Sequence, residues 1–200
     1  MDTIFFHYSF IAVCLAFIAV RVTYQRLALR TMGRAEFKEG RVAKGLRIVL
    51  AGPLVAVLLA YMIRPEGLSW AALPLPEWAR WAGLAMAWAA LPLLWWVHWA
   101  LGSNFSGLLH VREDHTLVTY GPYRWVRHPM YSVFYLYMGG ILLLTANWLI
   151  GGLMLAGLTA VIITRLRREE AAMIEKFGDS YRQYMERTGR FLPPLGAHHA

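Results

Sequence analysis

Four stretches of the chain contain almost no charged side chain. They cover residues 4–20, 46–63, 81–101 and 129–164, with Arg47 near the start of the second. A helix needs roughly 20 apolar residues to cross the hydrocarbon core of a bilayer. The fourth stretch has 36 residues, which as one helix would be about 54 Å long. Because that length is too great for one crossing, we expect two helices there.

We place the break in the fourth stretch near Ala146-Asn147, with Trp148 at the membrane interface. The sequence therefore predicts an all-α integral membrane protein. Its transmembrane helices, about five in number, are expected at residues 4–20, 46–63, 81–101, 130–145 and 148–165.

The residues after the last span predict a further helix of a different kind. From residue 168 to about 188, apolar side chains recur every three to four positions, at Met173, Phe177, Tyr181 and Tyr184. This spacing is typical of an amphipathic helix. Gly178 can interrupt or kink it, and Gly189 with Pro193-Pro194 should end it.

Charges in the loops predict the orientation. Residues 21–47 contain eight Lys or Arg against two acidic residues, whereas residues 64–80 contain two of each. Basic loops stay in the cytoplasm, so the N-terminus should lie outside and the C-terminus inside after five crossings. Residues 165–200 add seven Lys or Arg to the cytoplasmic side. Residues 102–128 should face the cytoplasm as well.

Composition agrees with a membrane location. The chain is 58% hydrophobic and 16% charged, against about 25% charged in a soluble domain. We interpret the net charge of +8 as a topology signal. The sequence has no basic stripe of the kind that binds nucleic acid, so we expect no nucleic-acid partner. Cys14, the single cysteine, lies in an apolar run and should only pack there. The histidines are not at ligand spacing, so we expect no metal.

Polar side chains with chemical potential gather at residues 121–131, where the cytoplasmic loop meets the fourth span. Pro129 suits the first turn of a helix, and the free N–H groups of such a turn can hold a carboxylate or a phosphate. Arg, Tyr and Trp at this position can equally be interfacial anchors.

A second group of charged residues, 165–170, follows the last span directly. Arg165 and Glu169 are four positions apart and therefore share one helix face. They can form an ordinary solvated ion pair. A charge this close to the membrane is costly, however, unless it faces a polar cavity or a partner.

Residues 115–118 (His-Thr-Leu-Val) are less informative. Two apolar residues in a polar loop predict a short buried strand or turn. His98, inside the third span, can be satisfied by a neighbouring helix.

Together these segments resemble the isoprenylcysteine carboxyl methyltransferase family. The resemblance covers residues 108–194. Its elements are His115-Thr116-Leu117-Val118, Gly121-x-Tyr123, Arg127-His128-Pro129-x-Tyr131, Arg165-x3-Glu169-Glu170-x6-Phe177-Gly178-x2-Tyr181-x2-Tyr184 and Thr188-Gly189-Arg190. The Arg-His-Pro-x-Tyr element also recurs in phospholipid N-methyltransferases, small thiol methyltransferases and membrane sterol reductases. The order and spacing of all the elements are more specific.

The resemblance implies a helical membrane fold with an S-adenosylmethionine pocket at the cytoplasmic face, from which S-adenosylhomocysteine is released. It assigns Arg165 to the methyl acceptor as the catalytic residue, with Arg127, Glu170 and His110 in support. The residues that it implies for the cofactor are His115, Thr116, Leu117, Val118, Tyr123, His128, Pro129, Met130, Tyr131 and Glu169.

We therefore expect residues 1–200 to form a single membrane domain, with N-terminal spans in 1–100 and the cofactor and catalytic region in 108–194. The expected reaction is carboxyl O-methylation of a lipidated, isoprenylcysteine-like acid or a small apolar acid. The expected location is a bacterial inner membrane, with the active site facing the cytoplasm. Phospholipid N-methylation and thiol S-methylation are alternatives, and an NADPH-dependent membrane reductase or a non-enzymatic scaffold would be of another class.

Overall fold

The computed structural model describes residues 2–32, 41–102 and 116–194, with side chains described at 3–27, 52–102 and 116–194. In these ranges the chain is helical and forms no strand. The α-helices are α1 (Asp2–Met32), α2 (Arg41–Ile63), α3 (Glu77–Leu101), α4 (Pro129–Thr145), α5 (Trp148–Phe177) and α6 (Asp179–Arg187). Two 3-10 helices, η1 (Pro65–Ala71) and η3 (Gly121–Arg124), lie in the connections.

The break predicted in the fourth apolar stretch is confirmed. Ala146 ends α4 in the left-handed conformation, with φ of 46°. Asn147 then caps α5, because its side-chain oxygen accepts a hydrogen bond from Ile150 N at 3.2 Å. Its side-chain nitrogen also donates to Leu68 O at 2.9 Å, which attaches the turn to η1. The polar Asn147 thus has partners although it is buried.

Three helices in the described part of the chain are long and apolar enough to cross a membrane. They are Thr3–Leu27, Glu77–Leu101 and Trp148–Phe177. Gly52–Ile63 and Pro65–Ala71 would make a fourth if this pair, bent by 119°, is one broken span. The helix Pro129–Thr145 is apolar but shorter, with 17 residues. The structure therefore gives three to four candidate spans by length and composition.

The last predicted span and the start of the predicted amphipathic helix are not two separate helices. The helix α5 continues without interruption to Phe177, and its 30 residues correspond to about 45 Å. Residues 165–177 consist largely of good helix formers, so nothing in them stops the helix. The break comes at Gly178, whose φ of +54° favours glycine. The predicted amphipathic helix is therefore divided between the end of α5 and α6.

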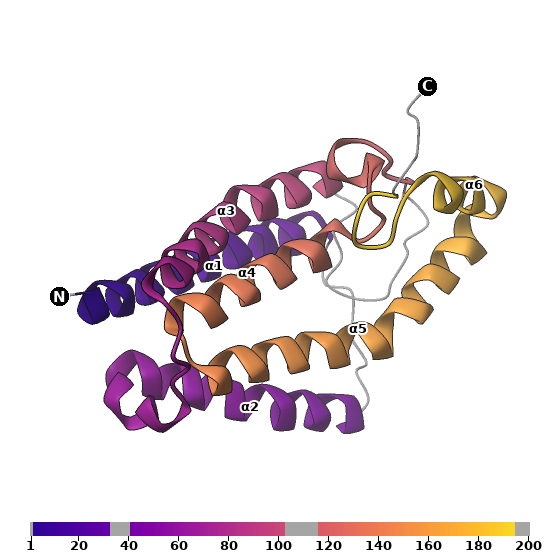
Figure 1. Ribbon diagram of the computed structural model, residues 1–200. Helices are drawn as coiled ribbons and strands as arrows, with labels where there is room; N and C mark the ends of the chain where they lie inside the picture. The colour runs from indigo at the N-terminus through magenta and orange to yellow at the C-terminus, as the bar shows by residue number, and fades with distance from the viewer. Residues whose placement is uncertain (1, 33–40, 103–115, 195–200) are drawn as a thin grey trace.

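The core of the bundle lies where α3 packs against α4, with α1 alongside both (Figure 1). Glycines let α3 and α4 approach closely. A Cβ on Gly83 would lie 2.5 Å from Leu144 N, and one on Gly140 would lie 2.7 Å from Ala87 N. Small residues at such crossings are typical of membrane helices, because their association depends on close packing.

A polar contact inside the bundle fastens α1 to α3. His98 is buried, and its Nδ1 lies 2.7 Å from Leu94 O one turn earlier. Because a carbonyl only accepts, Nδ1 carries the ring proton and Nε2 is the acceptor. Arg21 of α1 donates to that Nε2 at 3.2 Å. The expectation that a neighbouring helix would satisfy His98 is confirmed.

The helices α4 and α5 meet at the turn around Asn147 and diverge toward their other ends, while α2 runs along α5 (Figure 1). At the far end of α5, α6 and the segment after it reach back toward the start of α4. This return brings residues 185–191 beside residues 123–132.

Candidate functional site

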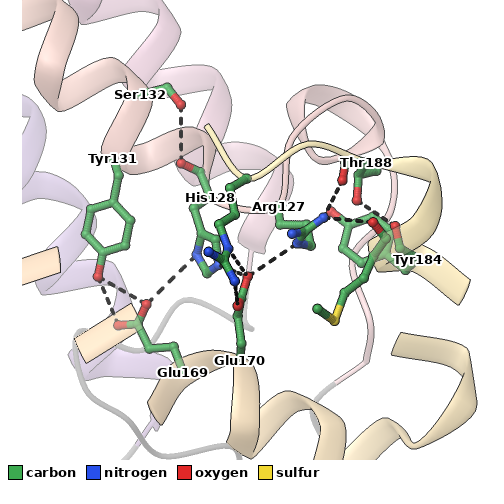
Figure 2. Close-up of polar contacts among 10 residues, drawn as sticks. Arg127, His128, Tyr131, Ser132, Glu169, Glu170, Tyr184 and Thr188 are labelled. Atoms are coloured by element: carbon green, nitrogen blue, oxygen red, sulfur yellow. Dashed lines mark hydrogen bonds and ion pairs between the residues drawn. The ribbon is translucent and has the colours of Figure 1, made fainter. Parts of the chain in front are cut away.

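Three separate segments meet where α4 begins. They are the loop before α4, the charged part of α5 and the segment after α6 (Figure 2). Main-chain hydrogen bonds join the first to the third: Arg127 N donates to Gly189 O at 2.8 Å, and His128 N donates to Arg190 O at 3.0 Å. Gly189 N in turn donates to Trp125 O at 3.1 Å, which gives a parallel bridge between Val126 and Gly189.

Glycine is required in this pairing. A Cβ on Gly189 would collide with the carbonyl group of Leu192. The tight return of the chain after α6 is therefore compatible with glycine but not with a larger residue at position 189.

Glu170 is the buried anion of the site. Arg190 donates to it through two nitrogens, Nε at 3.2 Å and Nη2 at 2.9 Å. Arg127 Nε donates to the same carboxylate at 3.4 Å. The side chain of Glu170 is only 8% exposed, and a carboxylate at that depth needs such partners. Glu170 thus connects α5 to both of the paired segments.

Arg127 makes hydrogen bonds through both its Nε and its Nη1. In addition to Glu170, its guanidinium donates to the main-chain oxygens of Met185, at 2.9 Å, and of Thr188. Tyr184 donates to Tyr123 O at 2.6 Å in the same region. These contacts hold the C-terminal part of the site against the loop, so Arg127 and Glu170 have a structural function there.

Glu169 differs from its neighbour because it is partly exposed. Tyr131 OH lies 3.0 and 3.1 Å from its two oxygens, and Arg165 Nη2 lies 3.2 Å from Oε1. Its side chain is 23% exposed. The guanidinium of Arg165 has a buried Nε that makes no hydrogen bond within the described residues. Glu169 and Arg165 can therefore both accept a further partner.

His128 stands between the two carboxylates. Its Nδ1 is 3.9 Å from Glu169 Oε2, and its Nε2 is 3.5 Å from Glu170 Oε1. Both separations exceed hydrogen-bond length, and the buried Nε2 has no hydrogen-bond partner in the described part of the chain. Burial lowers the pKa of His128, although the two carboxylates act in the opposite direction. The ring is therefore neutral at pH 7.

The structure brings together six of the residues that the sequence singled out. Figure 2 shows five of them around the start of α4, and Arg165 joins them through its ion pair with Glu169. The set comprises Arg127, His128, Tyr131, Arg165, Glu169 and Glu170. Arg127 and Glu170, expected in supporting roles, have side chains that are 9% and 8% exposed.

The other predicted residues have different surroundings. Met130 faces α1, since its sulfur lies 4.0 Å from Arg21 Nη1. Pro129 is buried at the first position of α4. Burial raises the pKa of the Tyr123 phenol, so this group stays protonated at neutral pH.

Residues 116–118 lead into the loop that carries the site. Thr116 is exposed, Leu117 is half-buried and Val118 is buried. His110 and His115 lie outside the described residues. In the described part of the chain no three metal-ligating side chains form a cluster.

Two neighbours of the site were not predicted from the sequence. Arg190 pairs with Glu170, and the ring of Phe191 lies beside His128 and Tyr131. The motif Thr188-Gly189-Arg190 drew attention to this segment, but no spacing rule connects it with residues 60 positions earlier. The glycine, at which a chain can reverse closely, was the available signal.

The fold and the site define a helical integral membrane protein with a cluster of Arg, Glu, His and Tyr side chains at one end of its bundle. Residues 83–175 match the family model described as the isoprenylcysteine carboxyl methyltransferase (ICMT) family. A probable protein-S-isoprenylcysteine O-methyltransferase of Oryza sativa subsp. indica is 31% identical over 129 residues, covering 61% of this chain and 68% of the relative. The chain belongs to this family.

Two other comparisons describe the extent of the similarity. The protein-S-isoprenylcysteine O-methyltransferase of Rattus norvegicus is 30% identical over 130 residues, which are 64% of this chain but only 46% of the relative. The chain therefore matches about half the length of that protein. The solved structure of the eukaryotic intramembrane Ras methyltransferase ICMT, without a monobody, has a TM-score of 0.60 at 22% identity. The structural match covers 92% of this chain and 67% of the ICMT chain, and it shows that the two share a fold.

Proposed function

We propose that this chain is an S-adenosylmethionine-dependent membrane methyltransferase. Its acceptor would be the carboxylate of a lipidated, isoprenylcysteine-like acid or of a small apolar acid. The observation that carries the proposal is the Arg165–Glu169 pair on α5, in which Tyr131 binds the carboxylate and the buried Arg165 Nε has no hydrogen-bond partner in the described chain. Family membership supports the reaction type.

The polar groups of the site fit the charged groups of S-adenosylmethionine. That molecule carries an ammonium, a carboxylate and a sulfonium. The partly exposed Glu169 would pair with the ammonium. His128 Nε2, which is buried and has no hydrogen-bond partner among the described residues, would hold the carboxylate. The amides of His128, Tyr131 and Ser132 at the start of α4 already donate to main-chain oxygens.

The remaining cofactor contacts are proposed from the family resemblance. Tyr123 and Tyr131 would offer aromatic faces. The full set that we propose for the cofactor is His115, Thr116, Leu117, Val118, Tyr123, His128, Pro129, Met130, Tyr131 and Glu169. His110, Arg127 and Glu170 would support them.

Arg165 would orient the acceptor. A guanidinium has five N–H donors in a fixed fork, and only Nη2 of Arg165 is engaged with Glu169. A second carboxylate can therefore bind without displacing Glu169. The site contains three positive guanidinium groups and two negative carboxylates, and His128 is neutral, so its net charge is one positive unit. The one surplus positive charge favours an anionic acceptor.

The carboxylate acceptor agrees with the protonation states in the site. When bound, S-adenosylmethionine supplies an activated methyl group. A carboxyl with a pKa near 3.5 is already ionised at neutral pH, so no side chain has to remove a proton. The residues would act mainly by aligning the acceptor and excluding water.

We further propose that the chain crosses the membrane five times, through α1, α2, α3, α4 and α5. The N-terminus would lie outside, with the C-terminus and the site in the cytoplasm, in a bacterial inner membrane. Exposed tryptophans at both ends of α3 support a full crossing by this helix: Trp78 is 71% and Trp99 is 64% exposed. Their 21-residue separation corresponds to about 32 Å, close to the thickness of the hydrocarbon core.

The test uses the purified full chain, S-adenosylmethionine labelled in its methyl group, and two matched acceptors. The first is an N-acetylated cysteine with a farnesyl thioether and a free carboxylate, and the second is its carboxamide. We expect label in the first acceptor only, and we expect base to release it, because a methyl ester is base-labile. Base-stable label in phosphatidylethanolamine or in an alkyl thiol would instead indicate N- or S-methylation.

Two substitutions on α5 sharpen the test. We expect Arg165→Gln to reduce turnover of the farnesylated acid by about 10- to 150-fold, the range for a hydrogen bond to a charged group. Arg168→Gln, which removes an exposed guanidinium from the same helix, should leave turnover unchanged. Binding of NADPH without binding of S-adenosylhomocysteine would favour a reductase. A non-enzymatic scaffold would show neither turnover nor cofactor binding above background, and Glu169→Ala would change neither.

A further inference from the structure

Three aromatic rings surround one point at the start of α4. The ring centroids of His128 and Tyr131 are 5.8 Å apart, those of His128 and Phe191 are 6.2 Å apart, and those of Tyr131 and Phe191 are 6.3 Å apart. The rings therefore form a nearly equilateral triangle. His128 and Tyr131 come from one segment, whereas Phe191 comes from the distant segment after α6.

The main chain on both sides holds Phe191 in this position. His128 N donates to Arg190 O at 3.0 Å, and Ser132 Oγ donates to Phe191 O at 2.6 Å. The ion pair of Arg190 with the buried Glu170 anchors the same segment. Phe191 is half-buried, whereas the next side chain, Leu192, is 76% exposed. The fold thus presents the Phe191 ring to the site but leaves Leu192 outside it.

A carboxylate lies at one side of the triangle. Glu169 accepts a hydrogen bond from the hydroxyl of Tyr131, and its Oε2 is 3.9 Å from His128 Nδ1. Aromatic rings beside a carboxylate suit a weakly hydrated cation, because the faces of Tyr and Phe rings attract positive charge within about 6 Å of their centroids. The centroids of Tyr131 and Phe191 are 6.3 Å apart, so one cation placed between their faces could lie within that range of both rings. The neutral His128 ring would complete the wall of this site.

The proposed methyl donor carries two cationic groups, an ammonium and a sulfonium, and the sulfonium is the one better suited to the aromatic rings. An ammonium has N–H donors, so the carboxylate of Glu169 can bind it directly. A sulfonium has no N–H or O–H donor and forms at most weak C–H···O contacts, so ring faces are suitable partners. The triangle and Glu169 can therefore bind the two cations of one molecule side by side.

We propose that Phe191, together with His128 and Tyr131, forms the surface that binds the sulfonium of S-adenosylmethionine. Phe191 would be a specificity-determining residue that favours the charged methyl donor over its neutral thioether product. This inference rests on the proposed function. It also implies that methyl transfer weakens binding at the sulfur, because the attraction to the rings disappears with the charge.

Calorimetry on the full chain without an acceptor tests the inference. Two ligands are compared, S-adenosylmethionine with a charged sulfur and S-adenosylhomocysteine with a neutral one. We expect Phe191→Leu to weaken binding of the first by about 3- to 30-fold, the range of a cation–π contact, and binding of the second by less than about twofold. Phe191→Tyr, which keeps the ring, should restore the preference.

Leu192→Ala is the matched control, since it alters the same segment at an exposed side chain, and it should change neither affinity. Equal weakening of both ligands by Phe191→Leu would overturn the inference and leave Phe191 as packing. If the natural chain binds neither ligand, the proposed function itself has failed, which is a different result.

A second measurement applies if Phe191→Leu does not fold. Fluorinated phenylalanines at position 191 keep the shape of the ring but reduce the negative charge of its face. We expect affinity for S-adenosylmethionine to fall with each added fluorine while affinity for S-adenosylhomocysteine stays constant. Parallel or absent changes for the two ligands would contradict the inference.

Discussion

Glu169 and Glu170 are adjacent in the sequence, but their side chains have different environments. Glu170 is buried and bound by Arg127 and Arg190, whereas Glu169 is partly exposed and bound by Tyr131 and Arg165. Consecutive positions on a helix point about 100° apart. One carboxylate therefore fastens the fold while the other remains available to a ligand.

We predict that Glu170→Ala lowers the free energy of unfolding by about 3–5 kcal/mol, because it leaves Arg127 buried with less compensation. Glu169→Gln should change it by less than about 1 kcal/mol and should abolish measurable S-adenosylmethionine binding. Unfolding in detergent and calorimetry give the two readouts. Glu175→Ala, at an exposed position of the same helix, is the control for both. A stable Glu170→Ala variant would contradict the assignment.

The pH dependence of stability provides a prediction for His128. Its pKa in the folded chain is lower than the ordinary value of 6.5. As the pH falls below 6.5, the unfolded chain binds the proton first, so unfolding becomes easier until the lowered pKa is reached. The loss is at most about 1.4 kcal/mol per pH unit for one proton.

The substitution His128→Asn removes this titration but keeps a polar side chain. We expect the natural chain to lose more thermal stability than the variant between pH 7.5 and pH 5. Melting temperatures of both proteins in the same detergent measure the difference. Parallel curves would show that His128 has no lowered pKa.

The sequence singled out most of the polar residues that the structure brings together. It did not predict which carboxylate is buried or which arginine pairs with it. Arg165 and Glu169 could be paired because their spacing on a helix is fixed. The pairing of Arg190 with Glu170 depends on a return of the chain after α6, which local spacing does not encode. The exposed or buried state of each carboxylate also depends on this return.

Among the helices, the closest packing is that of α4 against α3. On α4, Gly140 lies against the main chain of α3, whereas Gly139 faces only the end of one α3 side chain. A Cβ on Gly140 would lie 2.7 Å from Ala87 N and 2.8 Å from Gly83 O, both main-chain atoms. A Cβ on Gly139 would lie 3.6 Å from Met86 Cε, which is an ordinary contact.

We predict that Gly140→Ala destabilises the bundle by about 1–3 kcal/mol, the usual cost of overpacking. Gly139→Ala, one residue away on the same helix, should have little effect or stabilise it slightly. Unfolding of the two variants in detergent can be compared directly. Equal effects would mean that α3 and α4 do not approach as closely as described.

Helix positions were predictable where an apolar run ended at a clear signal. The break at Ala146-Asn147 is such a case, because Asn147 is a strong helix cap. The continuity of α5 from the apolar run into the predicted amphipathic helix was not foreseen, since the charges after residue 164 mark the end of the apolar run rather than the end of the helix. A helix ends only where its main chain is interrupted, here at Gly178.

At the scale of the whole molecule, the proposed orientation can be tested with cysteine reporters. Cys14 is the single cysteine and is buried, so the natural chain gives a low background. Ser69 in η1 and Ser180 in α6 are both exposed. In intact cells, we expect a membrane-impermeant maleimide to label Ser69→Cys but not Ser180→Cys. After lysis both should react, and the reverse pattern in intact cells would reverse the topology.

The pairing of residues 188–191 with residues 125–128 also has a consequence for biosynthesis. Chains emerge from the ribosome with their N-terminal parts first, so all the apolar helices leave the ribosome before Gly189 and Arg190 do. Until then Glu170 lacks its two-nitrogen partner, and the segment that carries Phe191 is not yet attached. Anchoring by the apolar helices therefore begins before the site is complete.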